Sequence, residues 1–175
     1  MKTLISLTAI LLFLFGCSSN STNSDVENNF SIFLSLDIEN NSPDKIPLDK
    51  LILEDEPFLN LRSIESYEWA NHRITFSNET KEKLKLKEPL FGRYFITIVQ
   101  NQRIYWGLFT DDLSSGSCQN PVIRLSPRQP SFNSFITDEF VIERAYPEYF
   151  GNENDIDLRK NLRIFSALEE SGKLK

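Results

Sequence analysis

The sequence predicts an α+β fold in which a largely antiparallel sheet carries a C-terminal amphipathic helix packed on it. Apolar side chains alternate from Phe30 to Ile38, which is the period of a half-buried strand. Two aromatic and β-branched segments, 94–99 and 103–109, are joined by three polar residues and predict a hairpin. Large apolar residues recur at helical spacing from Leu158 to Leu168. No long crossover helix separates two strands, so antiparallel pairing is favoured over a parallel doubly wound sheet.

Shorter elements are expected between the first strand and the hairpin. Residues 40–44 have turn chemistry, and the apolar run 51–53 predicts a second strand that ends before Pro57. Residues 60–66 are expected to form one helical turn. Two short strands are expected around the Ala70-Asn71-His72 turn, and they carry Tyr67, Trp69, Ile74 and Phe76. A capping residue followed by charged helix formers predicts a short solvated helix over 78–85.

The second half of the chain supplies the remaining elements. Apolar residues on both faces of the 94–109 hairpin predict a central strand pair, covered on one side by a helix. Segments 122–125 and 140–143 are strand candidates, separated by the proline-containing loop 126–131. The last helix is expected to begin at a cap on Asp155 and to end at Gly172. Its predicted sheet-facing stripe consists of Leu158, Leu162, Phe165 and Leu168.

The N-terminus has the pattern of an export signal. Lys2 precedes about a dozen mostly apolar residues, too few to cross a bilayer as a helix of ~20 residues. Leu14-Phe15-Gly16-Cys17 resembles the lipobox of bacterial lipoproteins. This resemblance implies that residues 1–16 are a lipoprotein signal peptide and that Cys17 is the lipidation site and first residue of the mature chain. The alternatives are an ordinary cleaved signal with a chance cysteine, or an uncleaved anchor.

The expected location is the cell envelope, outside the cytoplasm. Several acyl chains on Cys17 would make a stable membrane anchor, whereas one chain binds only marginally. Ser18 and Ser19 follow, rather than the Asp that resembles an inner-membrane retention signal. The outer membrane is therefore expected where the host has one.

A tether is expected between the lipid and the fold. Residues 17–29 comprise the lipidated cysteine and twelve residues with a single apolar side chain, too few to offset the entropy of ordering. Those twelve residues extend to ~40 Å and average ~20 Å, so the domain would move free of the lipid headgroups. Residues 30–175 have the length of one globular domain.

Charge and cysteine content exclude several classes of protein. The net charge of −6 becomes about −7 when Lys2, the only charged residue of the signal, is removed. This balance excludes nucleic acid as a partner, because phosphates demand clustered Lys and Arg. With Cys17 carrying lipid, Cys118 has no intramolecular partner, so the fold stands without a disulfide. His72 is the sole histidine, which excludes a zinc site with several imidazoles, and no cofactor is expected.

The segment 111–121 is the candidate binding loop. Ser114, Ser115, Gly116 and Ser117 are small residues whose backbone N–H groups are able to face an anion, with Trp106 as an aromatic contact. Ser and Gly are also what a tight connection contains, and the segment lacks the Lys of a phosphate loop. A binding module further predicts exposed aromatics, unless these belong to the core: Tyr105, Trp106, Tyr146 and Tyr149.

Catalytic and metal chemistry have weaker sequence support. Cys118 and His72 supply the residue types of a thiol hydrolase, without a local signature around either. Residues 152–157 resemble part of a calcium loop, but the turn glycine is absent and Arg163 stands where a bidentate Glu closes such loops. Residues 54–56 and 111–112 offer paired carboxylates for glycoside hydrolysis, or a solvated acidic edge.

The segments 53–64, 92–109, 114–123 and 167–174 resemble the extracytoplasmic head domain of SecD-type export proteins, over about residues 50–175. The chain also resembles small uncharacterised bacterial lipoproteins. Neither resemblance implies a catalytic residue. The sequence therefore predicts a lipid-anchored binding or envelope-accessory module with an envelope protein as partner. The alternatives are a small envelope hydrolase that uses the Ser114–Cys118 loop, or an inhibitor or immunity lipoprotein.

Overall fold

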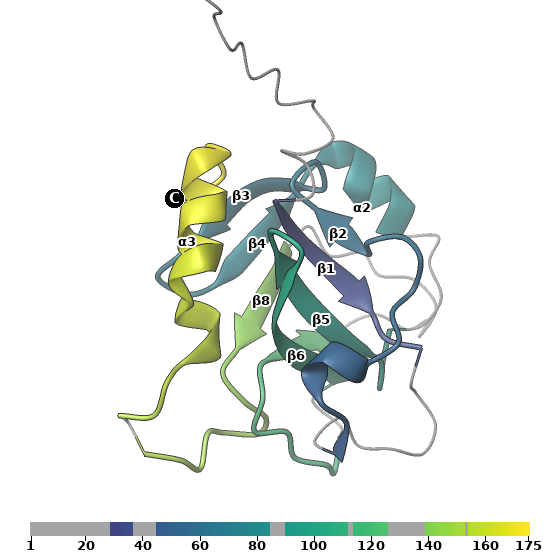
Figure 1. Ribbon diagram of the computed structural model, residues 1–175, viewed down its shortest axis with the longest axis vertical. Coiled ribbons are helices and arrows are strands. Elements are labelled where there is room, and N and C mark those ends of the chain that lie inside the picture. The colour runs from purple at the N-terminus through teal and green to yellow at the C-terminus, as the bar shows by residue number, and fades with distance from the viewer. Residues whose placement is uncertain (1–28, 37–44, 85–89, 112–113, 126–138, 153) are drawn as a thin grey trace, which may run out of the picture.

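The computed structural model describes residues 29–36, 45–84, 90–111, 114–125, 139–152 and 154–175 (Figure 1). The predicted signal peptide, most of the predicted tether, the 40–44 turn and the 126–131 loop lie outside these residues. The strands are β1 Phe30–Leu34, β2 Leu59–Asn60, β3 Ile64–Glu68, β4 Arg73–Phe76, β5 Tyr94–Val99, β6 Gln102–Asp111, β7 Val122–Leu125 and β8 Glu139–Glu143. The helical segments are η2 Leu48–Lys50, α2 Asn78–Leu84, η3 Leu158–Lys160 and α3 Leu162–Glu170.

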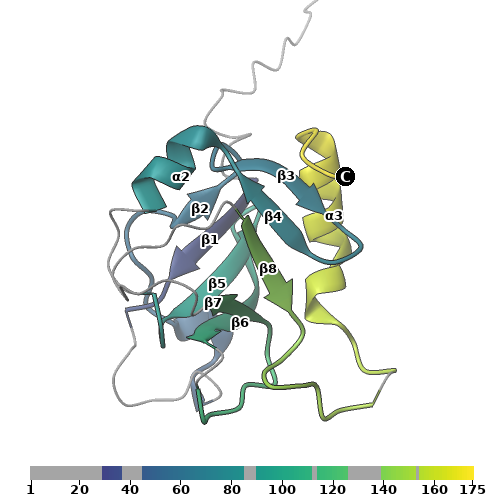
Figure 2. The ribbon, with the colours of Figure 1, turned by 180° about the vertical axis from the view of Figure 1, so that it is seen from behind.

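The strands form one eight-stranded, strongly curved sheet in the order β2-β1-β5-β6-β7-β8-β4-β3. Every neighbouring pair is antiparallel except β6 and β7, which are parallel. The prediction of a largely antiparallel sheet with few helices, one of them C-terminal, is confirmed. The short helices lie around the curved sheet, with α3 on one flank (Figures 1 and 2).

The β5–β6 hairpin lies in the middle of the sheet, as predicted. Its two-residue turn places Gln100 and Asn101 in the left-handed region, at φ 49° and 61°, which matches the twist of the paired strands. Phe95 belongs to the main core, together with aromatic residues of β4, β6 and β8. Ile96 points to the opposite face, where it packs with the segment 46–53. Both faces of the hairpin are therefore covered, and the second face is covered by this segment and its η2 turn.

Three expectations for the first part of the chain are wrong. Residues 60–66 do not form a helical turn, because the Asn60 side-chain oxygen accepts hydrogen bonds from the backbone N–H groups of Arg62 and Ser63 and turns the chain from β2 into β3. The 51–53 run contributes only an isolated bridge, between Ser35 and Leu53. The predicted alternation of β1 also fails at Leu36, which is exposed.

Helix α2 and strand β4 agree with the prediction, and β3 begins earlier than predicted, at Ile64. The cap of α2 is Ser77, whose Oγ accepts a hydrogen bond from the Thr80 N–H at 3.3 Å. Strands β3 and β4 are joined through His72, which has a left-handed φ of 56°. Asn and His tolerate this conformation better than most side chains.

The predicted C-terminal helix is divided in two, and its predicted stripe is wrong at two positions. The Asn161 side chain caps α3 by accepting the Arg163 N–H at 2.9 Å, so the helix begins anew at Leu162. This start sets the rotation of α3, and the residues that it buries in the main core are Ile164, Ala167 and Leu168. Leu158 and Leu162 are exposed.

The end of α3 agrees with the prediction, and the chain then returns to the sheet. Gly172 has a left-handed φ of 68° and ends the helix. The tail beyond it runs parallel to β3: the Tyr67 N–H donates to the Lys173 carbonyl at 2.7 Å, and the Lys175 N–H donates to the Tyr67 carbonyl at 2.8 Å. The C-terminal residues thus cover the outer edge of β3, which would otherwise present unpaired backbone groups.

Candidate binding surface

The loop between β6 and β7 carries the predicted binding residues. Ser115, Gly116 and Ser117 are exposed, and Ser114 is half-buried. The Gly116 N–H donates to the Ser114 Oγ at 3.3 Å, and the Tyr146 hydroxyl donates to the Ser114 carbonyl at 3.1 Å. The Gly116 N–H is therefore used within the loop, and the serine side chains are what this loop offers to a ligand.

A second loop, after β8, is joined to the first. Cys118 and Tyr146 exchange two backbone hydrogen bonds, each 2.9 Å long. The Gln119 side chain donates to the Glu148 carbonyl at 3.2 Å and accepts the Phe150 N–H at 2.9 Å. Phe150 is 63% exposed. The exposed residues of both loops form one surface, called here the two-loop surface: Ser115, Gly116, Ser117, Gln119 and Phe150.

Trp106 lies at the base of this surface. It is half-buried, packs against the cluster of Cys118, Val122 and Tyr146, and meets the Tyr94 ring edge-on at 5.7 Å. The structure therefore brings Trp106 close to the loop with which the sequence grouped it. Glycine is required beside it at Gly107, because a Cβ there would overlap the Phe95 ring and the Pro121 carbonyl.

Of the four aromatics proposed as exposed, two belong to the interior. Tyr105 and Tyr146 are buried, so exposure of these two is wrong. Tyr149 is half-buried beneath the Arg144 guanidinium, whose carbon lies 3.6 Å from the ring centroid. Such a cation–π contact holds the ring in place.

Asp155 closes the second loop. Its Oδ2 accepts hydrogen bonds from the Tyr149 hydroxyl and the Asn152 N–H, both at 2.9 Å. The bond to the carboxylate raises the pKa of the Tyr149 hydroxyl. The Asp155 carbonyl accepts from the Arg144 guanidinium at 2.8 Å. Asp155 therefore fixes the loop rather than capping the C-terminal helix, a role that belongs to Asn161.

Asp157 and Arg159 form a mostly buried ion pair beside the loop. The guanidinium contacts both carboxylate oxygens, at 2.9 and 2.7 Å, and also donates to the Ile142 carbonyl at 2.9 Å. Burial alone would raise the pKa of Asp157, but the hydrogen bonds and charge of Arg159 lower it. The two aspartates of the proposed calcium segment are thus engaged within the chain. Among the described residues, no group of three metal-ligating side chains is found.

The Cys118 and His72 side chains have separate surroundings. Cys118 is 7% exposed, and its thiol donates to the Asn120 carbonyl at 3.5 Å. His72 is 1% exposed, and its Nδ1 lies 3.0 Å from the Tyr67 hydroxyl. Burial, and then the charge of Arg159, lower the pKa of His72 to about 4. A nucleophile and its base must approach to about 3 Å, and the described contacts of these two residues lie in different clusters.

Of the carboxylates proposed as pairs, Glu54 is engaged in an ion pair within the chain. Glu54 forms an ion pair with Arg93 at 2.6 Å, and Arg93 also donates to the Ser35 carbonyl at 3.2 Å. This contact ties the 52–54 segment to β1. Asp111 ends β6, and Asp112 lies outside the described residues.

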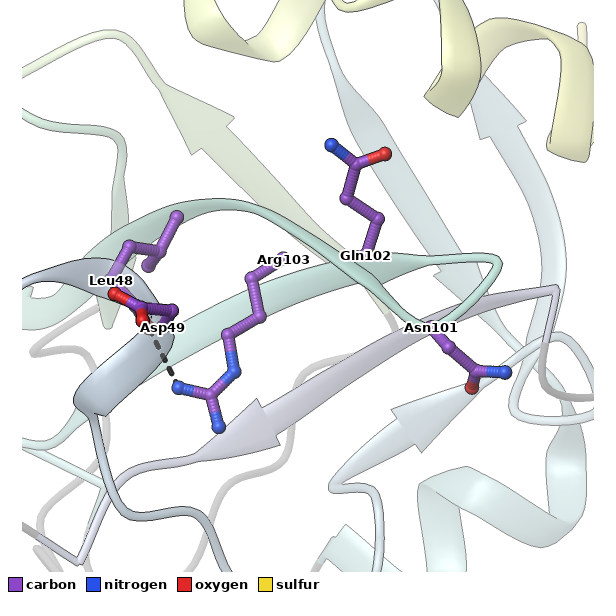
Figure 3. Close-up of a pocket in the computed structure, with 5 residues that line it drawn as sticks. All are labelled: Leu48, Asp49, Asn101, Gln102 and Arg103. Carbon is purple, nitrogen blue, oxygen red and sulfur yellow. Dashed lines mark hydrogen bonds between the residues drawn. The ribbon is translucent and has the colours of Figure 1, made fainter.

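A hollow of about 480 Å³ lies beside the hairpin turn, lined by Leu48, Asp49, Asn101, Gln102 and Arg103 (Figure 3). The Arg103 guanidinium donates to the carbonyls of Leu48 and Leu51, at 2.6 and 2.8 Å. The side chains of Asn101 and Gln102 point in different directions from it (Figure 3). Arg103 therefore fixes the η2 segment on the hairpin, and the polar groups around the hollow do not converge on one point.

Phe150 was not predicted to belong to the two-loop surface, Gln119 was not singled out within the predicted 111–121 loop, and Asp155 was expected to cap the C-terminal helix rather than to close the second loop. Their contacts join residues 3 to 31 positions apart, and these three residues share no spacing that would signal them. Comparisons with protein-family models, curated proteins and solved structures find no significant match to this chain. Within the described ranges, no helix has the length and apolar character needed to cross a membrane.

Proposed function

We propose that the protein is a lipid-anchored extracytoplasmic binding module of the cell envelope. Acyl chains on Cys17 hold it in the membrane, in the outer membrane where the host has one. The two-loop surface binds another envelope protein. The lipobox-like sequence and the serine-rich residues 18–29 support the anchor and its tether.

The main support for the binding proposal is that contacts within the chain hold the two-loop surface in one conformation. Its exposed serines and Phe150 stand on loops that are held by Tyr146, Gln119 and Asp155. A surface that is ordered before binding loses less conformational entropy when a partner arrives. Side chains that combine an aromatic ring with small hydroxyl groups suit a polar protein interface.

The position of this surface supports the same proposal. The two loops lie at one end of the molecule, whereas the start of β1 and the end of α3 lie toward the other end (Figures 1 and 2). The tether joins the domain at β1. A domain held by the tether alone is able to present the two-loop surface away from its point of attachment, toward a partner. An inhibitor or immunity lipoprotein would use the surface in the same way, and the hydrolase alternative gains no support from the burial of Cys118 and His72.

The anchor is tested by labelled palmitate. We expect the natural chain to incorporate the label and Cys17→Ser to lose it, with the Cys17→Ser protein left uncleaved or released from membranes. Cys118→Ala serves as the matched control and should keep the label. Label that persists in Cys17→Ser would contradict the anchor.

The binding surface is tested by site-specific photo-crosslinking in the native cells. A photoreactive residue at Ser115 should give a defined crosslinked product that the same residue at Asn78 does not give. Asn78 is exposed on α2, on a different part of the molecule. Equal crosslinking from both positions, or none from Ser115, would contradict the proposal.

A further inference from the structure

The most exposed large apolar side chains of the described residues lie on one short segment. Ile156 is 86% exposed and Leu162 is 78% exposed, with Leu158 between them also exposed. Side chains this exposed protrude from the surface rather than line a groove. We call Ile156, Leu158 and Leu162, with the neighbouring Lys160 and Arg163, the flank patch. Contiguous exposed apolar groups mark a contact surface, and these three side chains follow one another within seven residues of the chain.

The flank patch stands on a fixed backbone. The Asp157–Arg159 ion pair lies within the segment and is bonded to the Ile142 carbonyl of β8. Asn161 caps α3 directly before Leu162, and Asp155 closes the loop directly before Ile156. The exposure of Ile156 and Leu162 is therefore built into the fold and does not arise from a frayed end.

Some charged side chains of this segment are paired within the chain, and others are not. Asp155 is bonded to Tyr149 and Asn152, and Asp157 is paired with Arg159. Lys160 and Arg163 are exposed, and neither forms an ion pair within the described part of the chain. The flank patch thus offers apolar groups and free cations on a protein whose net charge is −6. This combination complements an anionic lipid surface.

The tether is long enough for the flank patch to reach the bilayer that holds Cys17. The Asn29 side chain donates to the Glu170 carboxylate at 3.4 Å, so the described chain starts beside the C-terminal end of α3. Leu162, at the other end of α3, is about 12 Å away along the helix axis. Residues 18–29 span up to ~40 Å, more than this separation. A domain anchored at Cys17 is therefore able to lie with the flank of α3 against the bilayer.

We propose that the flank patch is a second membrane contact, which inserts Ile156, Leu158 and Leu162 into the interface while Lys160 and Arg163 bind anionic headgroups. This inference rests on the proposed anchor, which keeps the domain at the membrane. The contact restricts the rotation that the tether alone allows. It also fixes the direction in which the two-loop surface faces.

The experiment measures the depth of a tryptophan in vesicles of phosphatidylcholine with one quarter phosphatidylglycerol. The chain from Cys17 to Lys175, with Cys118→Ala in every sample, is attached through the Cys17 thiol to a maleimide lipid. This chain spans every position that the structure describes, and Cys118→Ala is the same in every sample. The attachment does not depend on cellular acylation, so failure of the flank patch and failure of the natural anchor are observed separately. Brominated lipids then quench only those tryptophans that reach the bilayer.

We expect bromolipid quenching of the Ile156→Trp and Leu162→Trp proteins to exceed that of the matched control by about twofold or more. The control is Ile52→Trp, at an apolar position that is 58% exposed on the segment packed against the β5–β6 hairpin. Lys160→Gln with Arg163→Gln, or vesicles of phosphatidylcholine alone, should reduce the excess. Equal quenching at positions 52, 156 and 162, or none at any of them, would overturn the proposal.

Discussion

The β5–β6 hairpin and the C-terminal segment 155–172 both have strong apolar patterns, but only the hairpin has the structure that its pattern predicts. The hairpin is covered on both faces, so its apolar side chains pack against other apolar residues on either face. The C-terminal segment is buried on one face only, and which face that is depends on where the helix starts. A single cap, Asn161, moves the start and turns Leu162 outward. Periodicity therefore identifies the element, whereas the cap determines its rotation.

Substitutions on the buried and the exposed face of α3 should differ strongly in their effect on the free energy of unfolding. Leu168→Ala should lower the free energy of unfolding by about 2–5 kcal/mol, because Leu168 is fully buried in the main core. Leu162→Ala is the matched control, and it should change stability by less than about 0.5 kcal/mol. Phe165→Ala should fall between them, because Phe165 is half-buried with its ring edge-on to Trp69 at 5.1 Å. Urea unfolding of the three variants provides the measurement. Equal losses of stability for Leu162→Ala and Leu168→Ala would support the predicted stripe, in which both residues face the sheet.

A substitution at Gly107 should disrupt the packing of the hairpin. A Cβ at this position overlaps the Phe95 ring on one side and the Pro121 carbonyl on the other, so Gly107→Ala should cost about 3 kcal/mol. Gly116→Ala makes the same chemical change where the nearest atom outside the adjacent residues is 3.6 Å away, and it should be nearly neutral. Thermal melts of both variants test the difference. A neutral Gly107→Ala would show that the hairpin and the 114–121 loop are not packed this closely.

A pH dependence is expected where the sheet meets the C-terminal segment. Burial lowers the pKa of His72 to about 4, from an ordinary 6.5. Between these values the unfolded chain binds a proton and the folded chain does not, so stability falls as the pH falls through this window. The loss amounts to at most about 3 kcal/mol and is complete below pH 4.

His72→Asn keeps a side chain that tolerates the left-handed backbone and removes the titrating group. Urea unfolding across the window should therefore show a smaller decline for this variant than for the natural chain. Identical slopes for the two proteins would show that His72 is not the group whose titration causes the decline in this window.

The sequence predicts the sheet better than it predicts the surface. Local patterns were sufficient for β4, β5, β6, β7, β8 and α2, because strand alternation, turn residues and caps involve residues only a few positions apart. The parallel pairing of β6 with β7 and the return of the C-terminal tail to β3 depend on distant residues, which single-sequence patterns do not report.

Some residues of the candidate surface were predicted from the sequence, and others were not. Ser115, Gly116, Ser117 and Trp106 were identified because small polar residues and a tryptophan stand out in the sequence. Phe150 and Gln119 were missed because their roles arise from one contact between two loops. Tyr105 and Tyr146 were proposed as exposed alternatives and are buried, since residue type alone does not give burial.

Mass spectrometry of the N-terminal peptide, on protein isolated from its own cells, tests whether lipid on Cys17 holds the domain at a membrane. We expect a peptide that begins at Cys17 and carries the added mass of acyl chains, with residues 1–16 absent. A peptide that begins at Met1, or at any residue other than Cys17 without added mass, would contradict it.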